Sequence, residues 1–202
     1  MHPVLERVVC QIAVELNGAD AETTQIHPLG LIHKWNAQQI IEHLILGYRE
    51  TTRQLETRLS KGHRPRNVDR TSLQWLLQLM ILSFGKLPSG VPAMEETMPA
   101  PGRFGAMSGR QLDELLRQEM EALDSALDRC RRKFGMERVA HHPLLGPLRV
   151  DQWRRFHVVH GLHHLAQVRA VIQEVAPAPV PVRTGGTSLV KELQVPIQRP
   201  LA

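Results

Sequence analysis

Apolar side chains recur every three or four positions in four stretches of the chain, which predicts four amphipathic helices. These helices are expected over residues 4–16, 36–60, 108–135 and 151–175. The first ends at Asn17-Gly18, and the third begins at Ser108, which forms a capping-box pattern with Gln111. Pro177 ends the fourth helix. The pattern therefore indicates an all-α fold.

Other segments depart from this amphipathic pattern. Residues 72–84 (SLQWLLQLMILSF) are apolar nearly all round, which favours a buried helix over the alternative of a strand. Residues 88–105 are rich in Pro, Gly and Met and predict a long irregular loop, and residues 141–150 are expected to form the turn into the last helix. Because the composition becomes proline-rich after the last helix, we expect one domain at residues 1–176 and a weakly ordered tail at 177–202.

Length and composition favour one cytoplasmic domain. A chain of 202 residues with 42% hydrophobic residues can bury one sizeable core. No stretch approaches the roughly 18 consecutive apolar residues of a membrane-spanning helix, so no membrane partner is expected. The first sixteen residues lack the basic start and cleavage site of a secretory signal, which makes the cytoplasm the expected compartment.

The basic charge and the cysteines do not indicate a specialised function. The net charge is +5, but Arg and Lys alternate with Asp and Glu along the chain, so we expect no nucleic-acid partner. The most basic run, residues 129–133, closes a predicted helix, where cations suit the helix dipole. Cys10 and Cys130 each have apolar neighbours at helical spacing and are expected to be buried free thiols.

The predicted helix at 151–175 carries several imidazoles on one face. A rotation of about 100° per residue aligns six of its side chains: Trp153, His157, His160, His164, Gln167 and Val171. Burying an imidazole without partners costs about 1–3 kcal/mol, so several together require an explanation. His160 and His164 lie one turn apart and can reach the same ion. Hydrogen-bonded core histidines are the alternative.

A third metal ligand is expected from another helix. His43 lies among apolar neighbours in the run IIEHLIL, on the side of its helix that would be buried. Three neutral imidazoles suit one divalent transition metal such as Zn, Ni, Fe or Cu, and they leave positions open for water. Glu42 and His157 are candidates for proton transfer, whereas a fourth protein ligand such as His157 or His33 would indicate a closed, structural site.

Two side chains near the expected ligands have supporting roles in this interpretation. His163 points away from the imidazole stripe and is interpreted as an outer or surface group. Gln167 is a candidate for orienting a ligand or a bound water.

Two motifs of this chain resemble the DinB-like superfamily, which includes the bacillithiol and mycothiol S-transferases. The motifs are HGLHHLAQ at 160–167, preceded by HPLLGPLRVDQWRRFH, and KWNAQQIIEHL at 34–44. The resemblance implies a four-helix bundle with up-down-down-up topology, here with an extra short apolar helix, and a metal held by three histidines. Trp35 and His43 match the pattern on the second helix. The motif on the last helix is matched by His160, His163, His164 and Gln167.

The resemblance covers about residues 4–175 and implies two classes of function. The first is a metal-dependent S-transferase or hydrolase, in which the metal lowers the pKa of a bound water or of a substrate thiol. The loop at 88–105 is expected to cross the surface, and the alternative is a lid over the metal. The second is a non-catalytic, stress-associated bundle that binds a metal or a ligand. The expected partner is a small molecule such as a thiol, and a homodimer through exposed helix faces is the expected assembly.

Overall fold

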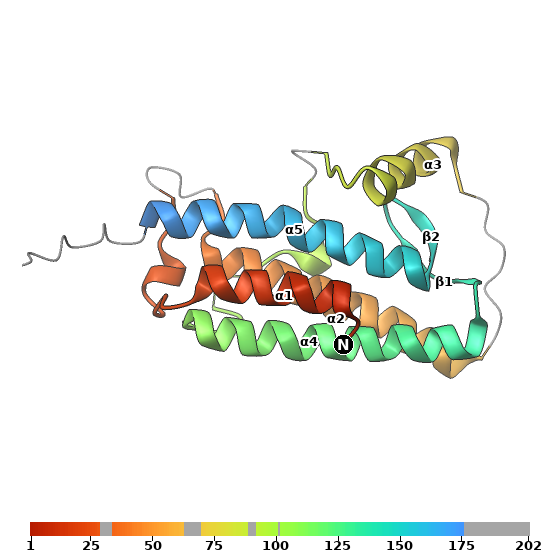
Figure 1. Cartoon of the computed structure of the whole chain (residues 1–202), viewed down its shortest axis with the longest axis horizontal. Helices are drawn as coiled ribbons and strands as arrows, with labels where there is room; N and C mark the ends of the chain where they lie inside the picture. The colour runs from red at the N-terminus through yellow and green to blue at the C-terminus, as the bar shows by residue number, and fades with distance from the viewer. Residues whose placement is uncertain (29–33, 63–69, 89–91, 101, 176–202) are drawn as a thin grey trace, which may run out of the picture.

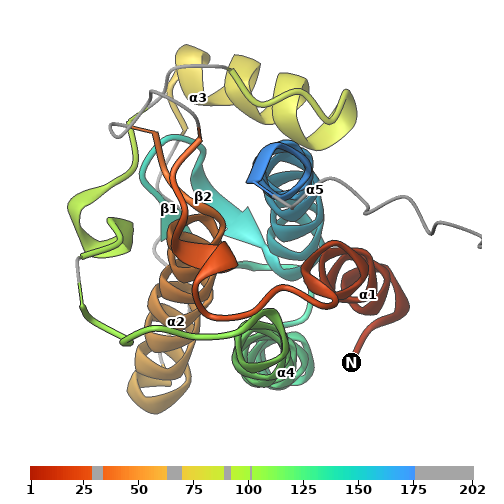
Figure 2. The ribbon, with the colours of Figure 1, turned by 90° about the vertical axis from the view of Figure 1, so that its left-hand side faces the viewer.

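Four long helices lie side by side along the long axis of the molecule (Figures 1 and 2). The computed structural model describes residues 1–28, 34–62, 70–88, 92–100 and 102–175, so the tail expected at 177–202 lies outside the described residues. The long helices are α1 (Pro3–Leu16), α2 (Ala37–Lys61), α4 (Gly109–Phe134) and α5 (Val150–Val175). A short helix, α3 (Ser72–Gln78), and short 3-10 turns at Thr23–Gln25 and Glu95–Thr97 complete the helical part. The predicted helical class is confirmed, with the addition of a small sheet.

Contacts between side chains show the direction of each long helix. Arg49 on α2 pairs with Glu119 on α4 at 2.7 Å. Seven residues further along α2, Glu56 pairs with Arg129, so α2 and α4 run in the same direction. Figure 1 shows α1 and α5 running in the opposite direction to α4.

Local sequence signals explain where the long helices begin and end. The Ser108 side chain accepts a hydrogen bond from the backbone N–H of Gln111, which confirms the predicted start of α4. Asn36 caps α2 in the same way, and Gly62 ends it in a left-handed conformation with φ of 65°. The apolar faces of the four long helices meet in a core that includes Leu5, Ile12, Ile41, Leu44, Leu55, Leu116, Leu127 and Val168.

The turn expected at 141–150 is instead a β-hairpin, which corrects the sequence analysis. Strands β1 (Arg138–His142) and β2 (Gly146–Arg149) pair antiparallel. With five residues in β1 and four in β2, the strands are too short for an alternating pattern to be recognised. Pro143 between them is typical of a turn, so the sequence predicted a turn alone. The hairpin contacts α2 through β1 and α5 through β2.

The segment 72–84 is helical, as predicted, but it is not buried. The helix α3 continues as a π-helix at Leu79–Ser83. The side chains of Leu73, Trp75 and Phe84 are 65%, 50% and 68% exposed. The segment covers the outside of α5 and the hairpin, as Figure 2 shows, and only one of its faces contacts the core. A largely apolar segment therefore lies mostly on the surface here.

The two thiols differ in their environment. Cys130 is buried, and burial raises its pKa to about 11, which confirms the expectation for this residue. Cys10 is exposed, so that expectation is wrong for it. On α1, Cys10 faces outward toward Glu6 and Arg117, whereas its neighbour Val9 faces the core. Among the described residues, no helix is both long and apolar enough to cross a bilayer.

Candidate metal centre

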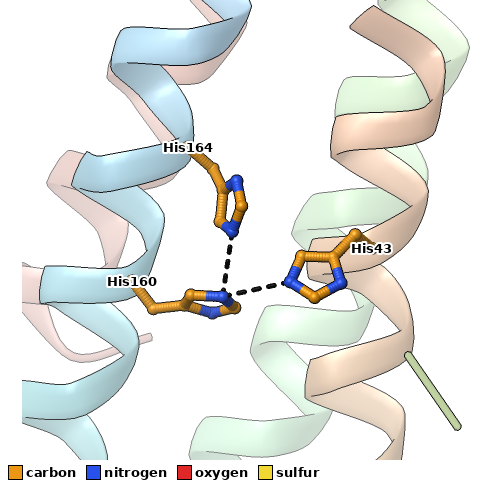
Figure 3. Close-up of side chains that lie close together, drawn as sticks. All are labelled: His43, His160 and His164. Atoms are coloured by element: carbon orange, nitrogen blue, oxygen red, sulfur yellow. Dashed lines mark hydrogen bonds between the residues drawn. The ribbon is translucent and has the colours of Figure 1, made fainter. Parts of the chain in front are cut away.

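Three histidines from two helices point their Nε2 atoms at one another (Figure 3). His160 and His164 lie one turn apart on α5, and their Nε2 atoms are 3.0 Å apart. His43 on α2 faces them, with its Nε2 atom 3.2 Å from that of His160. The sequence analysis selected these three residues, and the structure brings them together.

The outer nitrogens of two rings have partners that assign their tautomers. His43 Nδ1 lies 2.9 Å from the carbonyl oxygen of Thr97 and therefore donates its hydrogen to it. His164 Nδ1 lies 2.7 Å from Oε1 of Gln167 and donates in the same way. A neutral imidazole that is protonated at Nδ1 carries a lone pair on Nε2. Two lone pairs are thus directed at the Nε2 atom of His160.

Burial keeps the three imidazoles neutral. It lowers the pKa of His43, and it lowers that of His164 to about 3, with the nearby His43 as a further cause. The pKa of His160 falls well below its usual value, first because the ring is buried and then because His164 and His43 are close. A neutral imidazole is the form that binds a metal ion.

The spacing of the nitrogens fits a transition metal. Zn–N bonds of about 2.0–2.1 Å in tetrahedral geometry place two ligand nitrogens roughly 3.3 Å apart. The two Nε2 separations at His160 are close to this value, and the ligand atoms of all three residues lie within 4.8 Å of one another. Within the part of the chain that the structure describes, no cysteine or carboxylate joins this group. The three residues can therefore hold one ion and leave coordination positions open.

A cavity of about 260 Å³ lies beside the three imidazoles. Its walls come from α2, the loop before the Glu95–Thr97 turn, the hairpin turn and α5. They include Trp35, Gly47, Ile81, Leu87, Pro92, Met94, Thr97, Leu144, Trp153 and Phe156. The expected loop at 88–105 contributes several of these residues, so it covers one side of the site. Its Glu95–Thr97 turn also holds His43 through the Thr97 carbonyl.

The two candidates for proton transfer have different positions. His157 lines the cavity and is 1% exposed, and burial lowers its pKa to about 3. Glu42 is buried away from the cavity, where its Oε1 accepts a hydrogen bond of 2.8 Å from Gln38. Burial raises the pKa of Glu42. A role in proton transfer stays a prediction for both residues, with only His157 next to the cavity.

The remaining predicted residues lie around His164. His163 lines the cavity, and its Nε2 is 3.2 Å from Nε2 of Gln167. Gln167 thus bridges His163 and His164, as expected of a side chain that orients a ligand. His33, considered as a fourth ligand, lies outside the described residues. Thr97 was missed because it acts through its backbone carbonyl, which no side-chain pattern reports.

His142 lies in the wall of the cavity, and its burial is expected to make the stability of the fold depend on pH. Its Nδ1 accepts the backbone N–H groups of Leu144 and Leu145 at 3.2 and 3.3 Å. Burial, with a smaller effect of His141, lowers the pKa of His142 from 6.5 to about 4. Below about pH 6.5 the His142 side chain is protonated in the unfolded chain but still neutral in the folded protein. The free energy of unfolding therefore falls as the pH drops from 6.5 to 4.

The variant His142→Asn keeps a turn-forming acceptor that does not titrate. Its loss of unfolding free energy between pH 7 and pH 4 should be smaller than that of the parent by on the order of 2–3 kcal/mol. Urea unfolding at both pH values measures this difference. Because the other buried histidines are unchanged, the comparison isolates His142. Equal losses in both proteins would contradict the prediction.

Comparisons with known proteins correct the expected family. A family model described as "Protein of unknown function (DUF1569)" matches residues 18–171. It carries no assignment to the DinB-like superfamily or to the S-transferases, so the relationship suggested by the histidine motifs is wrong as a family assignment. Searches of curated proteins and of solved structures found no match. Because the family model matches most of the length of this chain, the chain belongs to the DUF1569 family of proteins of unknown function.

Proposed function

We propose that this protein is a metal-dependent enzyme in which His43, His160 and His164 bind one divalent transition metal, such as Zn, Ni or Fe. The convergence of the three Nε2 atoms carries the proposal, because two of them present lone pairs to the third at 3.0 and 3.2 Å. The single hydrogen that a neutral His160 can carry on Nε2 serves one of these lone pairs well, which leaves the other without a good donor among the three rings. A metal ion can accept a lone pair from all three rings at once.

We also propose that α1, α2, α4 and α5 form a four-helix bundle in up-down-down-up order. The directions of these helices and their common core support this arrangement. Ligands from facing helices of such a bundle are held by packed backbone rather than by loops. This explains how one histidine of α2 and two of α5 reach the same point.

The proposed chemistry is hydrolysis. A divalent ion on three imidazoles supplies a Lewis acid that lowers the pKa of a water molecule or of a donor atom of the substrate. Around it, Gln167 and the Thr97 carbonyl hold two ligands in the correct tautomer, and the apolar walls exclude bulk water. Transfer of a thiol rested on the superfamily resemblance alone, so we propose activation of water.

The test begins with protein purified without a histidine tag. Mass spectrometry should find about one equivalent of Zn, Ni or Fe per chain, or the protein should take up one equivalent when it is loaded. The loaded protein should hydrolyse p-nitrophenyl acetate faster than the chelator-treated protein, with a rate that rises with pH through about 7. A protein that cannot be loaded with any of these metals would overturn the proposal.

The alternative is a non-catalytic protein that holds the metal for structure, and X-ray absorption spectroscopy distinguishes it. Three nitrogen ligands with at least one water oxygen support the enzyme. A closed shell of four protein ligands would favour the alternative. His157 is the cavity residue to examine first in that case, since both of its ring nitrogens are buried without a partner.

A further inference from the structure

Gly47 lies in the middle of α2, and no close contact with another helix requires a glycine at this position. Glycine destabilises a helix interior relative to alanine, so its presence there requires a cause. A Cβ atom added at Gly161 would lie 2.6 Å from Cγ1 of Val8, and one added at Gly109 would lie 2.0 Å from the Leu16 carbonyl oxygen. Those two glycines allow helices to approach closely. A Cβ atom at Gly47 would meet nothing within 4 Å.

The empty space at Gly47 belongs to the cavity beside the metal centre. Gly47 follows His43 by one helical turn, so both lie on the same face of α2, and both line the cavity. Any longer side chain at this position would extend into the cavity next to the imidazole. The missing side chain therefore sets the room that is available to a ligand of the metal.

The lining of this cavity favours an uncharged molecule. None of its described lining residues is a lysine or an arginine. Its one carboxylate, Glu50, is already engaged by two nitrogens of Arg53 and by Gln54. An anionic group placed against these walls would lose its hydration and find no cationic side chain of the lining in return.

Two residues of the cavity lining carry buried hydrogen-bonding groups that have no partner. Trp153 Nε1 and both ring nitrogens of His157 are buried and unpaired. The two residues are 2% and 1% exposed, and both line the cavity. Buried polar groups in folded proteins normally have partners. These groups can serve one polar atom of a bound molecule.

We infer that the cavity binds a small, uncharged and mainly apolar molecule next to the metal, and that Gly47 determines how large a body it admits. The inference rests on the proposed metal site and adds its substrate class. The apolar body occupies the space beside Gly47, and one polar atom of the molecule lies near Trp153 and His157. Polyanions such as nucleotides are excluded by both charge and volume.

The test compares three hydroxamic acids as probes on protein whose metal content has been measured. All three offer the metal the same donor group. Benzohydroxamic acid should bind at least about tenfold more tightly than acetohydroxamic acid, because its ring buries more apolar surface. It should also bind at least about tenfold more tightly than 4-carboxybenzohydroxamic acid. Calorimetry measures all three affinities.

The variant Gly47→Leu fills the cavity without replacing a proposed metal ligand. It should weaken benzohydroxamic acid at least about tenfold and acetohydroxamic acid less than about threefold, with unchanged metal content. Gly47→Ala is the matched control and should stay within about threefold of the parent for both probes. Unchanged binding of benzohydroxamic acid in Gly47→Leu, or no preference for the uncharged ring in the parent, would overturn the inference.

Failure of the metal site would be seen separately. If the parent holds no metal, the proposed function fails, and the cavity is then titrated with benzyl alcohol, which needs no metal. Fluorescence of Trp35 and Trp153, both in the cavity wall, should change in the parent and not in Gly47→Leu. No change in the parent would overturn the inference about the cavity as well.

Discussion

Replacing His160 with alanine is expected to reduce bound metal from about one equivalent per chain to less than about a tenth. His160 is the central residue of the proposed site, since its Nε2 atom lies close to those of both His43 and His164. His43 and His164, with ring centroids 4.8 Å apart, would offer the ion only two nitrogens, which is fewer than the three protein ligands of typical zinc sites. The loss of affinity should exceed the roughly 10- to 100-fold that removal of an outer hydrogen-bond partner costs. Metal analysis after gel filtration measures it.

Two further variants make the result specific. His141→Ala removes an exposed histidine of β1 and should leave the metal content unchanged. Gln167→Ala removes the acceptor of His164 Nδ1 and the contact with His163 but no proposed ligand, so it should weaken binding about 10- to 100-fold without abolishing it. Circular dichroism confirms that each variant is folded. A His160→Ala protein that keeps its full metal content would show that the ion binds elsewhere.

The three converging histidines could be predicted because their placement depends on helical periodicity. The four-residue spacing of His160 and His164 gives their common face directly, and His43 was marked by its apolar neighbours. The same reasoning could not place Glu42, which is adjacent to a ligand in sequence but points toward Gln38. Neighbouring positions on a helix differ by about 100°, so adjacency in sequence does not bring a side chain to the site.

Features that depend on tertiary packing could not be predicted from the sequence. The segment 72–84 has the composition of a core helix, yet Trp75 and Phe84 are exposed because the four long helices already fill the core. Cys10 shows the same limit, since one position on α1 decides between the core and the surface. The histidine motifs pointed to a superfamily that the family match does not support. A short histidine motif shows which side chains share a helix face, but it does not establish ancestry.

Replacing Arg154 with alanine is expected to destabilise the fold by about 3 kcal/mol or more. Asp124, on α4, is only 4% exposed, and its Oδ1 accepts hydrogen bonds of 2.9 and 2.7 Å from Arg154 on α5. Its Oδ2 accepts the backbone N–H of His2, which precedes α1, at 2.6 Å. The carboxylate thus joins three helices. Without the guanidinium, a buried negative charge keeps only one of these partners.

An exposed ion pair provides the control for this prediction. Arg110 and Glu114 lie one turn apart on the surface of α4, with side chains 83% and 62% exposed, so Arg110→Ala should change stability by less than about 0.5 kcal/mol. Urea unfolding gives both values, and thermal unfolding should show a decrease of about 10 °C for Arg154→Ala alone. If both variants lose less than about 1 kcal/mol, the buried carboxylate does not hold α1, α4 and α5 together. The helix that carries His160 and His164 would then be fixed by apolar packing alone.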